Sequence, residues 1–397
     1  MTIRRISLAA GLALAAVGCS NEDLITPPVP LYKGGAMFQR YVSMGNSITA
    51  GVQSGGINDS TQQQSYAALV AGKMGSPYYY PSLNVPGCPP PFTNIFTGAR
   101  VLGGTSTTCA LRNPNIPPFL TNVAVPGAEV IDGISNFPTP GTNSNALTLV
   151  MLGARTQTQA MMDARPTFVS VWLGNNDLLG AVEAGDTTLA TDTAAFRTEY
   201  AQVLDSIDAT GASAVLIAVG LGHLANNVVV PFFSRGTTWY GLWASGAFAP
   251  APFTVAANCA PPRGDTVIVS FAYGFGLLAA SQAGPDTLSC TAAPVVEPPE
   301  VAFFVRLQLE YNAIIQALAA AHGWAFTDSV NTTLDSLAGV PNQFAPFPNS
   351  AVACSGSPFG FAFSCDGIHP NQGTQLLIAR KLVRAINAKY GSAIPVP

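Results

Sequence analysis

The sequence is poor in charged residues and in histidine, and both shortages limit what the protein can do. Only 10% of its 397 residues are charged, with 17 Lys and Arg against 21 Asp and Glu. Beyond the first few residues there is no basic cluster, so we expect no nucleic-acid partner. The three histidines are dispersed and no Cys-x-x-Cys pair occurs. This leaves no ligand set with recognised metal spacing, and we expect neither a metal nor a cofactor.

Long apolar runs are missing as well. Gly, Pro or polar residues interrupt every later apolar stretch well before the ~20 residues that a spanning helix needs. At the N-terminus, Arg4 and Arg5 precede an uncharged apolar stretch, residues 6–17, which is too short to span a membrane. A basic region followed by a short apolar region is typical of an export signal.

Residues 16–19, Ala-Val-Gly-Cys, follow this stretch and resemble a bacterial lipobox. In such a box Cys19 carries the lipid and becomes the first residue of the mature chain; a plain secretory signal cut nearby is the alternative. We therefore expect residues 1–18 to be a lipoprotein signal peptide and residues 19–36 a Pro-containing tether. The protein would be exported and anchored by its lipid at the outer membrane or cell surface.

The remaining cysteines are even in number, as expected in an oxidising compartment. Six cysteines allow fifteen connectivities, and pairing of sequence neighbours is our prediction. The predicted pairs are Cys88 with Cys109, Cys259 with Cys290, and Cys354 with Cys365.

An acid and a base lie close together near the C-terminus. Asp366 stands three residues before His369, a spacing with which some serine hydrolases keep a catalytic imidazole beside its orienting carboxylate. On its own the pair also fits an ordinary structural role. His223 has no acid three residues away, and His322 closes a helical stretch, so both compete poorly for the role of base.

A serine nucleophile is predicted where the folded part of the chain begins. Ser47 follows a short strand and a Gly-Asn turn, which exposes its hydroxyl and leaves its N–H available to an oxyanion. Gly127, in Val-Pro-Gly-Ala, offers a second N–H. Asn176 comes after an apolar run, residues 168–173, that reads as a buried parallel strand. Taken singly, each of these residues also fits a turn or capping role.

Together these segments resemble, in order, the blocks of the SGNH or GDSL family of serine esterases and lipases. Gly45–Thr49 matches the family's Gly-Asp-Ser-x-Thr, Gly127 its oxyanion glycine, and Gly174–Asp177 its Gly-x-Asn-Asp. Asp366 and His369 match its Asp-x-x-His-Pro. The matched blocks are short, yet they bracket residues from about 40 to 390.

The resemblance implies a Ser-His-Asp triad of Ser47, His369 and Asp366, and an oxyanion hole of Ser47, Gly127 and Asn176. The reaction implied is hydrolysis of a carboxylic ester through an acyl-enzyme. Activity would fall below roughly pH 6.5, where an unperturbed imidazole becomes protonated.

One departure concerns the residue before the serine, because Asn46 replaces the family's Asp. A neutral amide oxygen must then accept whatever hydrogen bonds the carboxylate would accept. We expect a changed local network and a modest effect on rate. A surface lipoprotein that keeps the fold only for binding is the alternative.

The resemblance implies a flavodoxin-like three-layer α/β sandwich, in which a parallel sheet carries helices on both faces. We expect a single domain over residues 37–391, with loop insertions at about 86–120 and 226–300 that border the cleft. Helices are predicted over residues 194–209, 299–321 and 372–390. The second insertion shows no sustained helical period.

The substrate is left open between lipid esters and acylated surface glycans or peptidoglycan. Three apolar stretches, residues 228–233, 239–244 and 247–250, fit either a groove or lid for an acyl chain or the buried core of the insertion. We expect the protein to be a monomer.

Overall fold

The computed structural model describes residues 35–110, 112, 117, 119–135, 146–220, 233–249 and 252–397. The signal peptide, Cys19, nearly all of the tether, His223 and the apolar residues 228–232 lie outside the described residues. The predictions made for them therefore stay predictions.

A parallel sheet forms the centre of the protein. Its strand order is β1-β4-β5-β11, and all three neighbouring pairs run parallel. The strand bounds are β1 (Tyr41–Gly45), β4 (Phe168–Trp172), β5 (Ser213–Ile217) and β11 (Ala325–Thr327).

An irregular segment extends the sheet beyond β1. The N–H groups of Ser43, Val123 and Val125 donate to the carbonyls of Thr121, Ser43 and Gly45 at 2.8, 3.0 and 3.1 Å, with a parallel bridge between Ser43 and Asn122. Counted in chain order, the five neighbours run 2-1-3-4-5. This is the flavodoxin-like doubly wound order that was predicted.

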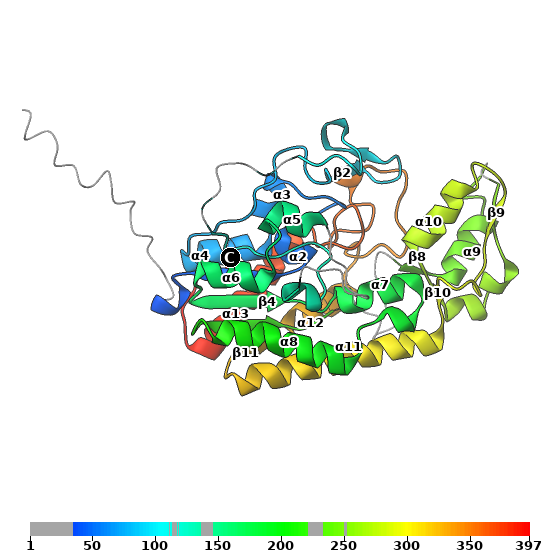
Figure 1. Ribbon diagram of the computed structural model, residues 1–397. Coiled ribbons are helices and arrows are strands. Elements are labelled where there is room, and N and C mark those ends of the chain that lie inside the picture. The colour runs from blue at the N-terminus through cyan, green and yellow to red at the C-terminus, as the bar shows by residue number, and fades with distance from the viewer. Residues whose placement is uncertain are drawn as a thin grey trace, which may run out of the picture.

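Helices cover both faces of the sheet (Figure 1). The α-helices are α2 (Ser47–Ala50), α3 (Asp59–Gln63), α4 (Tyr66–Met74), α5 (Ala146–Leu152), α6 (Gln157–Ala164), α7 (Asn176–Ala184), α8 (Thr193–Asp208), α9 (Gly236–Ala244), α10 (Phe271–Ala280), α11 (Pro298–Ala321), α12 (Ser329–Leu337) and α13 (Gln372–Tyr390). Short 3-10 turns are η2 (Ala36–Phe38), η3 (Val101–Gly103), η4 (Ile131–Gly133), η5 (Thr187–Leu189), η7 (Ala257–Cys259), η8 (Arg263–Asp265) and η9 (Cys354–Gly356).

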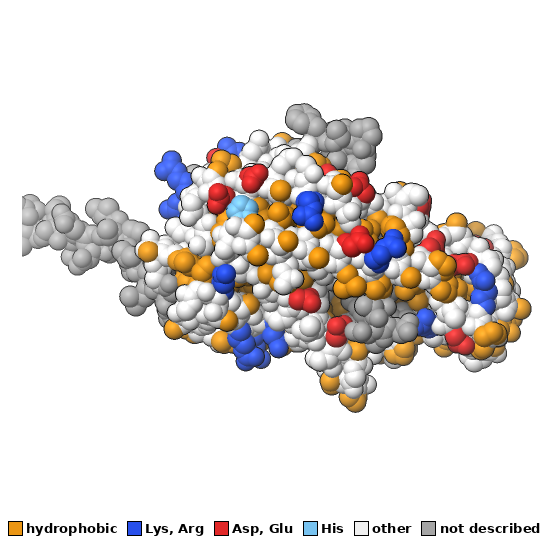
Figure 2. Space-filling view, turned by 90° about the horizontal axis from the view of Figure 1, so that it is seen from below, with side chains coloured by type: hydrophobic (Ala, Val, Ile, Leu, Met, Phe, Trp, Pro, Cys, Tyr) orange, Lys and Arg blue, Asp and Glu red, His pale blue; other side chains and the backbone are white. Residues whose placement is uncertain are grey.

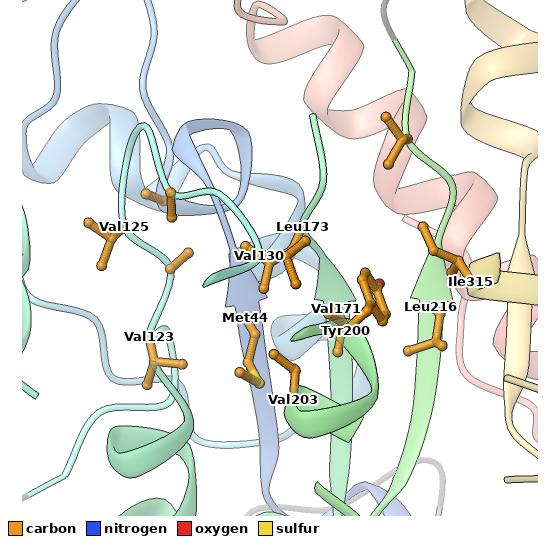
Figure 3. Close-up of a cluster of buried hydrophobic side chains, with 14 of the residues drawn as sticks. Met44, Val123, Val125, Val130, Val171, Leu173, Tyr200, Val203, Leu216 and Ile315 are labelled. Atoms are coloured by element: carbon orange, nitrogen blue, oxygen red, sulfur yellow. The ribbon is translucent and has the colours of Figure 1, made fainter. Parts of the chain in front are cut away.

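Alternating side chains of the strands separate two layers of core, because successive residues of a strand point to opposite faces. Val169 and Val171 of β4 pack with α6, α8 and α11, whereas Phe168 and Trp172 pack with α4 and α13. Figure 3 shows the first layer, where Met44, Val171 and Leu216 from three strands meet Tyr200 and Val203 of α8. The predicted three-layer sandwich is confirmed.

Three helices were predicted from their apolar periodicity, and all three form. The stretch 194–209 becomes α8, whose apolar residues Phe196, Tyr200, Val203, Leu204 and Ile207 are all buried. The stretches 299–321 and 372–390 become α11 and α13. His322 caps the C-terminus of α11, and its ring stacks on Trp324 with centroids 4.4 Å apart.

The expectation for the second insertion needs correcting, because it is not an irregular loop. It forms a lobe beside the main body (Figure 1), with helices α9 and α10 and its own sheets. Their strands are β6 (Phe233–Arg235), β7 (Phe253–Val255), β8 (Ile268–Ser270), β9 (Asp286–Leu288) and β10 (Val295–Val296), in the orders β10-β8-β6 and β7-β9. Short elements without a long helical period become stable here because they share an aromatic core around the fully buried Trp239.

The first insertion holds a two-stranded ribbon, β2 (Phe92–Asn94) with β3 (Ala99–Arg100). All three predicted disulfides are present: Cys88–Cys109 in this insertion, Cys259–Cys290 in the second, and Cys354–Cys365 before the acid-base loop. Each closes a local loop of 11 to 31 residues.

Charge is sparse on the protein surface. On the face in Figure 2, acidic and basic side chains lie scattered between hydrophobic and uncharged polar ones. Within the described ranges, no helix combines the length and apolar character needed to cross a membrane. The same residues contain no group of three or more His, Cys, Asp or Glu side chains able to hold a metal ion.

Candidate active site

Two predicted site residues lie at the carboxyl ends of neighbouring strands. Ser47 is the first residue of α2 and the second residue after β1, and Asn176 is the first residue of α7, shortly after β4. These strands flank the point where the strand order reverses, and ligands of open α/β sheets bind at that point. Both residues begin helices, so their N–H groups have no partner within the helix.

The turn that carries Ser47 is held from several directions. The buried Gln157 amide accepts from the Gly45 N–H and donates to the Gly45 carbonyl, both at 2.9 Å. A Cβ on Gly45 would lie 2.3 Å from Oγ1 of Thr49, so a side chain there would clash. Asn46 is 2% exposed and its Oδ1 accepts from the Ile48 N–H at 3.2 Å, capping α2. An amide therefore fills the acceptor role expected of the family's carboxylate.

The predicted oxyanion donors lie beside one another. Nδ2 of Asn176 donates to the Ala128 carbonyl at 2.8 Å, next to Gly127. One amide hydrogen is used in this bond, and the second can serve a ligand. Gly127 is exposed and has φ +80°, a left-handed conformation that favours glycine. The buried Asp177 carboxylate accepts from the Val130 N–H at 3.1 Å and so holds the same loop.

The predicted acid and base are hydrogen-bonded. Nδ1 of His369 lies 2.8 Å from Oδ2 of Asp366, and both side chains are largely buried. Oδ1 of Asp366 also accepts from the N–H groups of Ile368 and His369, at 2.9 and 2.8 Å. Burial alone would raise the pKa of the Asp366 carboxyl. The stronger, opposite effect of His369 and these N–H groups lowers this pKa to about 2. The acid is therefore ionised at neutral pH.

The acid loop is tied to the loop that follows the serine. The Gly55 N–H donates to Oδ2 of Asp366 at 2.5 Å. Ser54 donates its N–H to Oγ of Ser364 at 2.8 Å, and its own Oγ accepts from the Cys365 N–H at 3.2 Å. Ser54 has φ +53°, and such uncommon backbone in a non-glycine residue is often found at functional sites.

Ser47, Asn176 and His369 line one small cavity of about 70 Å³. Asp366 lies behind His369, and Gly127 adjoins Asn176 through Ala128. The cavity wall also includes residues from strand ends or the helices after them, namely Trp172, Leu179, Gly220, Asn331 and Leu334, and residues of the acid-base loop, namely Phe363, Ile368 and Pro370. The catalytic residues proposed from the sequence thus come from four separate segments to one edge of the sheet.

Sequence reasoning missed the residues that position this site. Gln157 left no signal, because one Gln at the start of a helix has many ordinary uses. Ser54 and Gly55 lie in a run of small residues after Ser47, and such a run does not identify its partner. That partner, the Asp366 loop, is 310 residues away in the sequence, so local patterns could not reveal it.

The strand order, the two faces of helices and the site at the switch point define the class: a doubly wound α/β protein with the sandwich expected of an SGNH hydrolase. No protein-family model matches the chain. No curated protein matches it either.

Solved structures that resemble the chain include the following three. A catalytic mutant of Axe2, an acetylxylan esterase from Geobacillus stearothermophilus, shares 12% identity at a TM-score of 0.39, covering 90% of this chain and 96% of that one. TesA shares 12% sequence identity with the chain at a TM-score of 0.37, and the likeness covers 88% of this chain and 98% of TesA. LAE5, an alpha/beta hydrolase enzyme from the metagenome of Lake Arreo, Spain, shares 14% sequence identity at a TM-score of 0.38. The likeness covers 90% of this chain and 98% of LAE5. Likeness at this level carries no argument about substrate, so the function must be inferred from the site itself.

Proposed function

We propose that the chain is a serine carboxylic ester hydrolase. Ser47 is the nucleophile, His369 the base and Asp366 the acid that orients it. The proposal depends on one observation: the 2.8 Å bond from Asp366 to Nδ1 of His369, whose ring shares a cavity with Ser47 and Asn176. A carboxylate on Nδ1 fixes the tautomer and leaves Nε2 to take a proton.

The reaction proceeds by acyl transfer. Oγ of Ser47 loses its proton to Nε2 of His369 and bonds to the ester carbonyl carbon, and the carbonyl oxygen becomes an oxyanion. The N–H groups of Ser47 and Gly127 and the Asn176 amide donate to that oxyanion. When it collapses, the bond from carbon to the alcohol oxygen breaks, and His369 returns the proton to the leaving alcohol. Water then repeats the sequence and releases the acid.

A small acyl group fits this site best. The cavity that contains Ser47 measures about 70 Å³, well below the roughly 300 Å³ of the smallest usual ligand pockets. An acetyl group matches this space better than a long chain. The same observation supports the second candidate, an O-acetylesterase of a surface glycan or peptidoglycan.

The proposal is tested with p-nitrophenyl acetate and a fluorophosphonate probe. We expect the wild-type protein to hydrolyse the ester and to be labelled by the probe, and Ser47→Ala to lose both. Ser206→Ala, at a half-buried serine of α8, is the matched control and should keep both. A folded protein that neither hydrolyses esters nor reacts with the probe would instead be a binding lipoprotein.

For location, we propose export and anchoring through lipid on Cys19, supported by the charged, apolar and lipobox-like segments of residues 4–19. Labelling with radioactive palmitate should mark the wild-type chain but not Cys19→Ser, and the wild type should sediment with membranes. Equal labelling of both would disprove the anchor.

A further inference from the structure

A second cavity, much larger than the first, lies next to the acid and base. It measures about 940 Å³, near the top of the roughly 300–1,000 Å³ range of ligand pockets. We call it the aromatic chamber, because six phenylalanines line it: Phe96, Phe248, Phe271, Phe275, Phe347 and Phe359.

The chamber walls are well packed. Phe271, Phe275 and Phe347 contact one another at ring-centroid distances of 5.2 to 5.8 Å. Behind them, the fully buried Trp239 packs on all three rings at 4.8 to 6.1 Å. Most wall residues come from both insertions and from the loop before Asp366, and Glu183 of α7, Asp366 and Ile368 complete the wall. Most of the chamber therefore belongs to segments added to the central sheet.

The chamber adjoins the small cavity at the acid-base loop. Asp366 and Ile368 line it, and Ile368 also lines the small cavity. Ser47 and Asn176 line the small cavity and not the chamber. The chamber is therefore reached from the side of the acid-base loop, away from the oxyanion donors.

This side is where the alcohol part of an ester must lie. The oxyanion donors fix the carbonyl oxygen, and Ser47 keeps the acyl group. His369 must reach the alcohol oxygen in order to return its proton. A substituent on that oxygen then extends past His369 and Ile368 and enters the chamber.

We propose that the aromatic chamber binds the alcohol portion of the ester, and that this alcohol is large and apolar. The inference rests on the proposed function. It gives the two cavities different tasks: about 70 Å³ for the acyl group and about 940 Å³ for the leaving group. The preferred substrates are thus short-chain esters of long-chain or aromatic alcohols.

Glu183 is the feature of the chamber that argues for another class of alcohol. It lies on α7 and lines the chamber, and burial raises its pKa while His369 lowers it. Aromatic rings with a carboxylate also suit a quaternary ammonium group. The six phenylalanines outnumber the two acids that line the chamber, Glu183 and Asp366, and Asp366 is already hydrogen-bonded to His369. We therefore favour the apolar alcohol and include a cationic one in the test.

The experiment varies one side of the ester at a time, using the full chain. Methyl, butyl and hexyl acetates vary the alcohol, whereas methyl acetate, butyrate and hexanoate vary the acyl group. Each buried methylene is worth roughly a fourfold gain in kcat/KM, so we expect hexyl acetate to exceed methyl acetate by at least about 50-fold. Lengthening the acyl group should give no gain.

Neighbouring alanines of α10 provide a matched pair of variants. Ala279 lines the chamber and Ala280 does not, and both are exposed. Ala279→Trp should lower kcat/KM for hexyl acetate at least about tenfold and leave methyl acetate within about twofold. Ala280→Trp should change neither. If Ala279→Trp fails to fold, Ala272→Trp, which also fills the chamber, takes its place.

Three results would overturn the proposal: a length preference that follows the acyl group, equal loss on both acetates in Ala279→Trp, or a preference for choline acetate that Glu183→Gln abolishes. Binding of 1-naphthol tests the chamber without catalysis. The Ser47→Ala variant should bind it, and adding Ala279→Trp should abolish the binding. Absence of any hydrolysis that depends on Ser47 would instead refute the ester hydrolase. The two failures are thus distinguishable.

Discussion

Asp177 should make the stability of the protein depend on pH in an unusual direction. Its side chain is 1% exposed at the start of α7, and Oδ1 has no hydrogen-bond partner in the described part of the chain. Burial raises the pKa of Asp177 to about 7, against the opposing hydrogen bonds from Val130 and Thr191, and Glu199 adds to the rise.

The magnitude follows from the difference between the folded and unfolded states. An unfolded Asp has a pKa of about 3.9, roughly three units below the folded value, which corresponds to ~4 kcal/mol. Between about pH 4 and pH 7 the folded protein holds this proton more tightly than the unfolded chain. The unfolding free energy contributed by Asp177 is therefore greatest below pH 4 and is lost as pH rises through 7.

Asp177→Asn removes this titration and keeps an oxygen that can accept from the Val130 N–H. We would measure urea unfolding of both proteins from pH 4 to pH 8. The unfolding free energy of the variant minus that of the wild type should rise by about 4 kcal/mol between about pH 4 and pH 8. A constant effect of the substitution on stability does not change this rise. Asp205→Asn, at an exposed position of α8, is the control for replacing an aspartate at the surface. A difference for Asp177→Asn that is flat to within about 1 kcal/mol would refute the assignment of a raised pKa.

Three further predictions concern the site. Asn176→Ala should lower kcat by roughly 10²- to 10³-fold, because an oxyanion donor is lost, and an unchanged urea midpoint would show that the fold is intact. Gly45→Ala should lose about 1–3 kcal/mol of stability in urea unfolding, because its Cβ would press on Thr49 at 2.3 Å; wild-type stability would contradict the close approach. Replacing Cys354 and Cys365 by Ser opens a loop of 11 residues, worth about 2.8 kcal/mol in chain entropy. Ester hydrolysis in that double variant should fall at temperatures where circular dichroism still reports a folded protein, and loss of both together would argue against a local effect.

Much of the site was predictable because parallel strands bring their carboxyl ends to one edge. Ser47 and Asn176 each follow a strand whose sequence predicts burial. These two strands, β1 and β4, are parallel neighbours, so the two residues lie close together. The pairing of Asp366 with His369 could be predicted from their spacing of three residues alone. The amphipathic period of α8 was equally local, since a helix repeats its buried face within a few residues.

What could not be predicted depends on partners far apart in the chain. The bonds from Ser54 and Gly55 to the acid loop join residues more than 300 positions apart, and no local pattern encodes them. The second insertion looked irregular because its elements are short. Packing around Trp239 and the bond between Cys259 and Cys290 stabilise them.

The bonds between the turn at Ser54 and the Asp366 loop also have a consequence for when activity can appear. A chain made from its N-terminus delivers Ser47 early, but His369 and Asp366 arrive more than 300 residues later. Contacts of such separation form late, because a long loop must be closed first. In the proposed ester hydrolase, a growing or partly folded chain would therefore be inactive, and hydrolytic activity would report completion of the whole domain. Any truncation that removes the last 40 or so residues should yield a protein that is inert from synthesis onward.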